Sequence, residues 1–306
     1  MGPSEGALAP ARVIIAYGQL AASMALVGAN VAVAKLLAEA LPIALVAFLR
    51  CGLAVLVLLP LVAWRDGLVR VPPVVRRALF WQAVFGTAIY NAGLLAGLRL
   101  TSALEGGLVL ASLPAVVALG SFLWLREALS PRQWLAAGLA GVGMAALTLA
   151  RLGGLGGGGS GLGNLLVFVG VCGEAAYVLL ARRVAGAVPV LTAALWMQAF
   201  SVLVLLPFAM PGIGAVAALA DPWLLGLLVF HSLTNSVLCL LLWYAGLRRV
   251  QAGVAGVFTL FLPASAALVA VVFLGEAFGA VHGLGFGLML GSVLLATWPG
   301  RYRSRA

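Results

Sequence analysis

The stretch AGLRLTSALEGG at residues 96–107 returns in the same chain as AGLRRVQAGVAG at residues 245–256. The two stretches begin 149 positions apart, at Ala96 and Ala245. The same offset matches further prolines, glycines and acidic residues: Pro114 with Pro263, Gly107 with Gly256, and Glu127-Ala128 with Glu276-Ala277. Nearer the start of each unit an offset of 147 matches Lys35 with Arg182, Pro42 with Pro189, and Pro60 with Pro207. Matches at such constant spacing indicate an internal duplication.

Both copies belong to a chain that is too apolar to be a soluble domain. Of the 306 residues, 64% are hydrophobic and 8% are charged, and the mean hydropathy is +1.18. A soluble surface needs far more charge than this. A bilayer core of about 30 Å is crossed by about 20 helical residues. Ten apolar runs meet that length: 13–33, 42–63, 78–98, 103–124, 132–150, 162–181, 190–210, 223–243, 251–274 and 279–298.

Each repeat contains five of these spans. Because five is odd, the second repeat must enter the membrane from the opposite side. Inverted repeats of this kind recur among transporters, with the substrate site near the midplane between the halves. The predicted fold is therefore an all-α integral membrane protein with ten transmembrane helices in two inverted five-helix repeats around a central cavity. The first repeat is expected over residues 1–153 and the second over 162–306, joined by a Gly-rich connector at 154–161.

The basic residues predict how the chain sits in the membrane. When the loops are numbered alternately, fourteen fall on the side of the N-terminus: Arg12, Arg65, Arg70, Arg76, Arg77, Arg126, Arg132, Arg182, Arg183, Arg248, Arg249, Arg301, Arg303 and Arg305. Only Lys35, Arg99 and Arg151 fall on the other side. The positive-inside rule then places both termini in the cytoplasm. The abundance of Arg relative to Lys, and of Ala and Gly, suggests a GC-rich bacterial gene. The expected location is therefore a bacterial inner membrane. Because these residues lie in loops and not on a face with aromatics, the net charge of +10 does not indicate nucleic-acid binding.

Ten spans in a five-plus-five repeat, AGLR before the fourth and ninth spans, a proline within each of these, and Glu-Ala just after them resemble the drug/metabolite transporter superfamily. The resemblance covers essentially the whole chain and is strongest to EamA-type exporters, among them the aromatic amino-acid exporters of the YddG kind. It implies a secondary transporter that exports amino acids or related small metabolites by alternating access. It also implies that the first four spans of each half surround the cavity and that the fifth and tenth are peripheral.

Glu174 is the foremost candidate for a functional residue, because ionisable groups at membrane depth are costly and usually functional. It lies about 12 residues into the sixth predicted span, near the bilayer centre. Arg182 follows eight residues later, a spacing that resembles the proton-coupling glutamate and following lysine of small multidrug exporters. Glu174 is therefore expected to bind a substrate ammonium group or to carry a coupling proton. The alternative is a structural ion pair, with Arg50 as a partner.

Further candidates for the cavity wall lie on matched faces of the third and eighth spans. Residues four apart share one helical face, which gives Gln82, Gly86 and Tyr90 in the third span and His231, Asn235 and Cys239 in the eighth. Thr234 flanks the second face. We expect these faces to line the cavity, although interhelical hydrogen bonding without substrate contact is the competing interpretation. Asn30, Tyr177 and Trp243 are also expected in the wall, and Trp243 has the apolar ring to stack on an aromatic substrate.

Two sets of residues have expected mechanical roles. Pro114 and Pro263 free backbone carbonyls in the fourth and ninth spans, and their symmetry favours a gating or hinge role. Small residues spaced by four let helices approach closely. The tenth span has such a stripe, formed by Gly279, Gly283, Gly287 and Gly291. It is expected to pack against a neighbouring helix in the chain or in a homodimer.

An enzyme is not expected. Residues 158–161 read G-G-S-G, similar to the motif of intramembrane serine proteases, but the serine lies in the flexible connector, where no base is held against it. Neither a cofactor nor a metal site is indicated, so the expected partners are a small-molecule substrate and the lipid bilayer. Two alternatives stay open. One is a carrier of phosphorylated solutes or nucleotide-sugars, weakened because Arg50 alone offers a cation within a span. The other is a multidrug or cation exporter of the same superfamily.

Overall fold

A computed structural model describes residues 5–67, 69–101, 109–110, 112–151, 161–262, 264–265, 268–269 and 280–297. Every regular element within these ranges is a helix. In the first half the helices are α1 (Glu5–Ala40), α2 (Ile43–Arg65), α3 (Pro73–Ala83), η1 (Val84–Ile89), α4 (Tyr90–Leu100), α6 (Leu113–Trp124) and α7 (Pro131–Arg151). In the second half they are α8 (Gly161–Val184), α9 (Val190–Ala209), η2 (Met210–Ala220), α10 (Pro222–His231), η3 (Ser232–Leu238), α11 (Cys239–Leu247), α12 (Ala252–Phe258) and α14 (Ala280–Thr297).

Prolines mark several of the helix starts. Pro42 precedes α2, Pro189 precedes α9, and Pro222 is the first residue of α10. The fixed φ of proline suits a helix start, where its missing N–H has no intrahelical partner in any case. Matched prolines also lie inside two equivalent helices, Pro60 in α2 and Pro207 in α9. The structure thus preserves the proline pattern of the duplication.

Five helical stretches within the described residues are long and apolar enough to cross a bilayer: Arg12–Asn30, Ile43–Arg65, Gly161–Val184, Val190–Ala220 and Pro222–Leu247. Many of their side chains are not covered by other parts of the protein. Leu56 in α2 is 68% exposed and Leu203 in α9 is 58% exposed. Large aliphatic side chains left outside on so many long helices match a surface that faces lipid.

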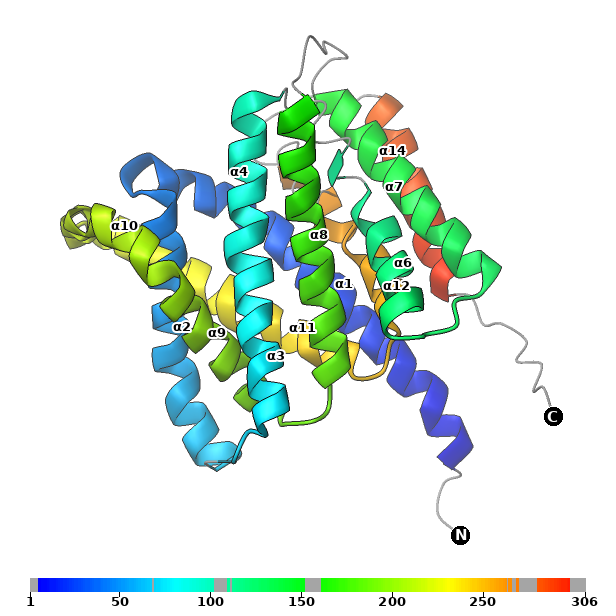
Figure 1. Cartoon of the computed structure of the whole chain (residues 1–306), viewed down its shortest axis with the longest axis horizontal. Coiled ribbons are helices and arrows are strands. Elements are labelled where there is room, and N and C mark those ends of the chain that lie inside the picture. Colours follow the sequence, from blue (N-terminus) through cyan, green and yellow to red (C-terminus); the bar gives the residue numbers. More distant parts are fainter. Residues whose placement is uncertain are drawn as a thin grey trace.

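The helices pack as two similar units related by inversion. The first span of one unit contacts the third span of the other, in the pairs α1–α11 and α4–α8. Equivalent spans contact each other in the pairs α2–α9, α6–α12 and α7–α14. In Figure 1, α1 rises from the N-terminus at the lower right, whereas α8, its equivalent, descends from the upper end. Equivalent helices therefore run in opposite directions, as a repeat with five spans requires.

Glycines allow the closest of these contacts, that between α4 and α8. A Cβ atom added at Gly97 would lie 2.7 Å from the Gly163 carbonyl oxygen, and one added at Gly93 would lie 2.7 Å from that of Leu166. Small residues on both helices let the backbones touch, as in other membrane helix pairs. This contact joins the two repeats beside the predicted site.

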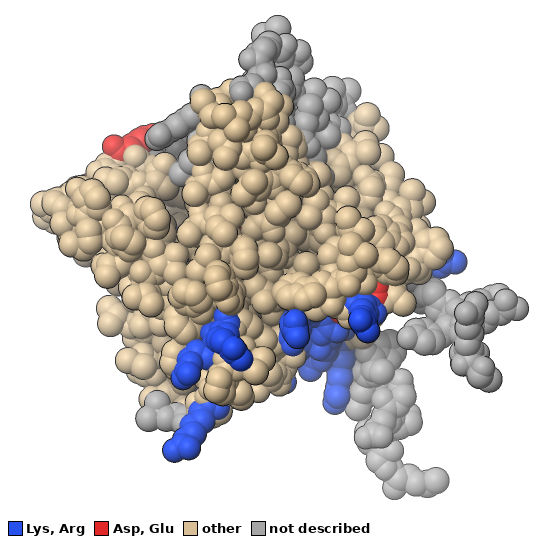
Figure 2. All heavy atoms as spheres, in the orientation of Figure 1, with Lys and Arg blue, Asp and Glu red and all other residues tan. Residues whose placement is uncertain are grey.

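Most of the described arginine side chains gather at one end of the molecule, whereas Arg50 lies within α2. They lie after α2 and before α3 (Arg65, Arg70, Arg76 and Arg77), between α6 and α7 (Arg126 and Arg132), and at the ends of α8 and α11 (Arg182, Arg183, Arg248 and Arg249). Figure 2 shows the basic atoms along the lower edge, where these helix ends meet. We call this the arginine end. Its charge asymmetry is the one that the loop pattern predicts.

Candidate functional site

Two π-helices interrupt the third and eighth spans at equivalent positions. They are η1 at Val84–Ile89 and η3 at Ser232–Leu238. The repeat offset of 149 carries residues 84–89 onto 233–238, within η3. A π-helix is uncommon, and short π segments inside α-helices occur frequently at functional sites. The faces predicted to line the cavity lie on and beside these two segments.

A polar cluster joins η3 to the first span. The amide oxygen of Asn30 accepts a hydrogen bond from His231 Nδ1 at 3.0 Å, and the Thr234 hydroxyl lies 3.0 Å from the same oxygen. Asn30 donates its own amide N–H to the Leu26 carbonyl at 3.0 Å. Asn30 and His231 are buried, with exposed fractions of 3% and 4%. Three of the predicted wall residues are thus brought together from spans that are distant in sequence.

A second cluster joins the third span to the eighth. The Tyr244 hydroxyl donates to Gln82 Oε1 at 2.6 Å. Gln82 Nε2 and the neighbouring Trp243 Nε1 are buried and have no hydrogen-bond partner within the described part of the chain. An unsatisfied buried donor costs about 1–3 kcal/mol. Gln82 and Trp243, both predicted wall residues, therefore keep donors available for another acceptor.

The two π-helices are held by matched contacts from α2 and α9. Thr87 of η1 and Ser236 of η3 are equivalent under the repeat. The Thr87 hydroxyl lies 3.3 Å from the Ser201 hydroxyl of α9, and Ser236 Oγ accepts from Arg50 of α2 at 2.8 Å. Gln198 of α9 also donates to the Ser236 carbonyl at 2.6 Å. Each π segment is thus anchored to the second span of the other repeat.

Glu174 lies on α8, the helix that packs against the third span. It follows Gly173, where an added Cβ would lie 2.9 Å from the Phe85 carbonyl oxygen. Tyr90 and Tyr177 are close enough to Glu174 to interact with it electrostatically, and the Tyr177 ring lies against Gly86. The Glu174 carboxylate is half-buried and forms no hydrogen bond or ion pair with another described residue. Glu174 is thus a carboxylate without a described partner on a helix that packs against the other repeat.

The remaining predicted wall residue is Asn235, which lies in η3, half-buried, next to Thr234. Of the two prolines, Pro114 is buried at the start of α6, and Pro263 lies outside the described residues. The ion pair of Glu174 with Arg50 that the sequence left open is not formed, because Arg50 bonds to Ser236 and Glu174 has no partner among the described residues.

Comparison with known proteins identifies the family to which this helical protein belongs. The model of the EamA-like transporter family matches the chain twice, at residues 14–149 and 161–298. The chain belongs to the EamA-like transporter family. This is a family of transporters and not of enzymes. The two matches and the fold together make the chain an all-helical membrane protein with a duplicated EamA domain.

A relative and a solved structure agree with this assignment. The EamA chain is 32% identical over 288 residues to the "Uncharacterized transporter YetK" of Bacillus subtilis, over 92% of this chain and 86% of that protein. It is also similar to a solved structure described as "Crystal structure of protein", with a TM-score of 0.74 and 20% identity over 94% of this chain and 98% of the other. At 20% identity, the similarity to the solved structure concerns the fold alone. It is consistent with ten spans in an inverted repeat.

The EamA transporter also contains a cluster that sequence reasoning missed, at the arginine end. Glu127 Oε1 accepts from Arg182 Nε at 3.0 Å, and Glu127 Oε2 accepts from Ser121 Oγ at 2.5 Å and from the backbone N–H of Ala252 at 2.7 Å. Arg182 also donates to the Leu247 carbonyl at 3.1 Å. These bonds join the ends of α6, α8 and α11 to the start of α12. We call Glu127, Arg182 and Ala252 the latch.

The backbone just before the latch is strained. Arg126 has a φ of +54°. Within the described ranges, the other residues with positive φ are glycines. The left-handed region costs a residue with a side chain roughly 1–2 kcal/mol. The left-handed conformation of Arg126 turns the chain after α6, and Glu127 then accepts a hydrogen bond from the first residue of α12. A strained turn that aims a charged side chain is a feature that surrounding contacts must maintain.

The glycine stripe of the tenth span faces outward. Gly279 lies outside the described residues, while Gly283, Gly287 and Gly291 are exposed on α14. A Cβ added at Gly287 or Gly291 would meet nothing within 4 Å. The contact of α14 with α7 uses another face, where Ser292 Oγ donates to the Ala136 carbonyl at 2.7 Å. The described glycines of the stripe therefore do not pack within the chain.

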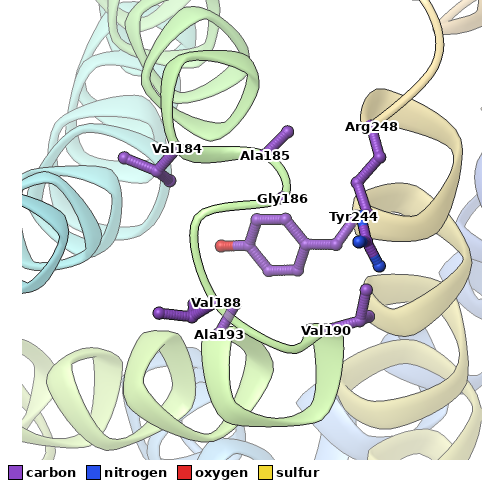
Figure 3. Close-up of a pocket in the computed structure, with 8 residues that line it drawn as sticks. All are labelled: Val184, Ala185, Gly186, Val188, Val190, Ala193, Tyr244 and Arg248. Carbon is purple, nitrogen blue, oxygen red and sulfur yellow. The ribbon is translucent and has the colours of Figure 1, made fainter. Parts of the chain in front are cut away.

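A small pocket lies at the arginine end and adjoins the second polar cluster through Tyr244. Figure 3 shows the Tyr244 ring beside the loop that carries Gly186, with Arg248 next to it. The pocket is lined by Val184, Ala185, Gly186, Val188, Val190, Ala193, Tyr244 and Arg248. None of the residues predicted from the sequence to contact substrate lines it. Its connection to the candidate site is Tyr244, whose hydroxyl reaches Gln82.

Proposed function

We propose that this EamA transporter is a secondary exporter of amino acids, with aromatic or bulky apolar ones favoured, that works by alternating access. The two repeats would be residues 1–153 and 162–306, joined by the connector at 154–161. The arginine end would be cytoplasmic, together with both termini, in a bacterial inner membrane. The resemblance to exporters of the YddG kind supports this substrate class.

The observation that carries the proposal is the Glu174 carboxylate, which has no hydrogen-bond or ionic partner in the described part of the chain. It is the fourteenth of the 24 residues of α8, roughly 20 Å along the helix from its start. A charge at that depth is costly, so an acid that lacks a protein partner is suited to a cation that comes and goes. The ammonium group of an amino acid is such a cation, and so is a proton.

Aromatic side chains beside the third span support the preference for aromatic substrates. Trp81 packs against Phe85 and Phe80, with ring centroids 5.7 and 5.6 Å apart. Phe80 also makes an edge contact with Phe200 of α9, at 5.5 Å. Gln82 follows Trp81 in the chain, and its amide N–H lacks a partner among the described residues. A third span that carries both aromatic rings and an available hydrogen-bond donor is compatible with an amphipathic aromatic ligand.

Radiolabelled amino-acid flux in proteoliposomes tests the proposal. Purified protein is reconstituted, vesicles are loaded with unlabelled substrate, and exchange of labelled phenylalanine, tryptophan, leucine, alanine and glutamate is measured with and without a pH gradient. Exchange should be fastest for phenylalanine and tryptophan and absent in vesicles without protein. If no amino acid exchanges above that background, the proposed substrate class is wrong.

Export of organic cations is a second candidate function, and the same observation favours it. Glu174 would then bind a lipophilic cation that carries no carboxylate. Adding tetraphenylphosphonium to the panel separates the two candidates, since an amino-acid exporter should not exchange it. Phosphorylated solutes belong on the same panel. Competition by phosphates without competition by amino acids would favour the anion-carrier alternative.

A further inference from the structure

Arg50 is a cation placed inside a membrane span. It is the eighth of the 23 residues of α2, about 10 Å along the helix from its start. Its side chain is half-buried. Arginine at such a depth costs at least a few kcal/mol unless its donors are satisfied. The equivalent residue of the second repeat is Met197, at the offset of 147, so the charge is not a requirement of the shared scaffold.

The eighth span holds Arg50 in a defined position. The Ser232 hydroxyl donates to the Arg50 carbonyl at 2.7 Å, and Arg50 Nη1 donates to Ser236 Oγ at 2.8 Å. Both serines belong to η3, so the π-helix fixes the backbone of α2 and the direction of the guanidinium at once. An arginine fixed at two points loses little further entropy when it binds a ligand.

The guanidinium has more donors than the protein uses. It carries five N–H groups, and the structure gives it one side-chain bond, to Ser236. No acidic group of the described residues pairs with it, since the ion pair found among them joins Arg182 to Glu127. An apolar residue at this position would lower the free-energy cost of placing α2 in the bilayer. The remaining donors form a fork that matches a carboxylate.

The surroundings of Arg50 belong to the candidate site and not to the lipid surface. Arg50 lies close enough to His231 and Cys239 to interact with them electrostatically. His231 belongs to the cluster with Asn30 and Thr234. Arg50 bonds to the two serines of η3, the π-helix that also carries Thr234. Arg50 therefore borders this polar cluster, and it forms no ion pair with Glu174.

We infer that Arg50 binds the carboxylate of the transported substrate, while Ser236 holds the guanidinium in place. The inference rests on the proposed function, since it assigns the second charged group of an amino acid. Glu174 would recognise the ammonium and Arg50 the carboxylate. A molecule with both charges would then be preferred over a molecule with either one alone.

Three probes with one ring system test the assignment: phenylalanine, phenethylamine, which lacks the carboxylate, and 3-phenylpropionate, which lacks the ammonium. Exchange of each is measured in proteoliposomes for wild type, Arg50→Met and Glu174→Gln. Arg50→Met introduces the residue of the other repeat. It should raise the KM for phenylalanine and phenylpropionate by about tenfold or more, the worth of a charge-assisted hydrogen bond, and leave phenethylamine within twofold. Glu174→Gln should spare phenylpropionate instead.

Arg183→Met is the matched control, because Arg183 is exposed at the end of α8 and its guanidinium lies over the Trp124 ring, 5.5 Å from the centroid. It should leave all three probes unchanged. Equal loss of all three in Arg50→Met would make Arg50 a structural anchor between α2 and η3 and would overturn the inference. If Arg50→Met leaves the exchange of all three probes unchanged, the inference is also overturned.

Two measurements keep the test independent of variant folding and of the proposed function. Wild type should exchange phenylalanine amide, which has no carboxylate, at least about tenfold less efficiently than phenylalanine; equal exchange excludes a carboxylate site. If wild type exchanges phenylpropionate in an Arg50-dependent way but no amino acid, the proposed function fails and the Arg50 site stands. If it exchanges neither phenylalanine nor phenylpropionate, both are wrong.

Discussion

At the scale of single residues, the candidate site is defined by polar groups that the protein leaves incompletely satisfied. The Glu174 carboxylate, the amide N–H of Gln82 and the indole N–H of Trp243 lack partners among the described residues. By contrast, Asn30 uses both ends of its amide. A buried polar group with no partner is destabilising, and one that persists is most simply explained by a ligand or a proton that completes it. The three unsatisfied groups come from the third, sixth and eighth spans, on helices that pack against the other repeat.

Glu174→Gln tests the role of the carboxylate as a proton carrier. Glutamine keeps the size and hydrogen-bonding capacity of the side chain but cannot bind and release a proton. Uptake of phenylalanine driven by a pH gradient should be abolished, while exchange of phenylalanine at equal pH should remain measurable, although weaker. Glu39→Gln, at an exposed carboxylate near the end of α1, should change neither. Unchanged dependence on the pH gradient in Glu174→Gln would exclude proton coupling at this residue.

At the scale of helices, the latch joins four helix ends, and its main acceptor is the Glu127 carboxylate. Both partners of the ion pair are mostly buried, with side-chain exposures of 26% for Arg182 and 13% for Glu127. Two further bonds at the same end also link the repeats. Thr192 donates to Asp66 at 2.9 Å, and Gln133 donates to Gln251 at 3.2 Å. At the arginine end the repeats are therefore joined by polar contacts as well as by buried apolar side chains such as Val117, Leu247 and Val254.

Glu127→Gln should loosen this end. Removing the charge leaves Arg182 without its ionic partner, and the free energy of unfolding should fall by about 1–3 kcal/mol, discounted for partial exposure. The measurements are the unfolding midpoint in detergent and the labelling rate of a single cysteine at Ala252. Arg183→Gln, next to the latch but outside it, should change neither. A labelling rate equal to that of the parent would show that the latch does not control access.

Gly97→Val tests the packing of α4 on α8. The new Cβ would lie 2.7 Å from the Gly163 carbonyl and 2.5 Å from a methyl group of Val167, so the helices must move apart. A loss of roughly 1–3 kcal/mol of stability is expected, as for other overpacked contacts. Gly138→Val is the matched control, because a Cβ there meets nothing within 4 Å. Equal unfolding midpoints for the two variants would contradict the close contact.

At the scale of the whole molecule, the repeat, the helical class and the gathering of arginines could all be predicted from the sequence, because each rests on pattern or composition. The bounds of α1 could not: the span predicted at 13–33 is part of a helix from Glu5 to Ala40, since hydropathy marks the apolar stretch and not where the helix ends. The π-helices could not be foreseen either, because one extra residue in a turn leaves no hydropathy signal.

The candidate site was predictable in part. Asn30, His231 and Thr234 were all expected in the wall, and the structure brings them together. Glu127 and Arg182 are 55 residues apart in sequence, and no periodicity connects residues on different helices. The matching of Lys35 with Arg182, and of Glu127 with Glu276, marked these positions without indicating that Glu127 and Arg182 bind each other. The importance of Arg50 also depended on its partner in η3.

Alternating access makes a prediction for the two matched faces together. Single cysteines replacing Tyr90 and Asn235 should react with a water-soluble thiol reagent, and phenylalanine should slow the reaction at both positions. The native Cys51, Cys172 and Cys239 are first replaced by alanine. A cysteine at Leu203, exposed on the outer surface of α9, should not be protected. If neither matched position is labelled, both side chains belong to helix contacts and not to the cavity.

The left-handed turn at Arg126 shows a conflict between two demands on one position. The second repeat has Gly275 there, followed by the same Glu-Ala pair, and glycine adopts this conformation without steric cost. Arg126 lies at the arginine end, where a positive residue would help to set membrane orientation under the proposed topology. Arg126→Gly should raise the unfolding midpoint, whereas Arg126→Val should lower it. The first repeat thus has an arginine, and with it a strained backbone, at a position where the sequence of the second repeat has glycine.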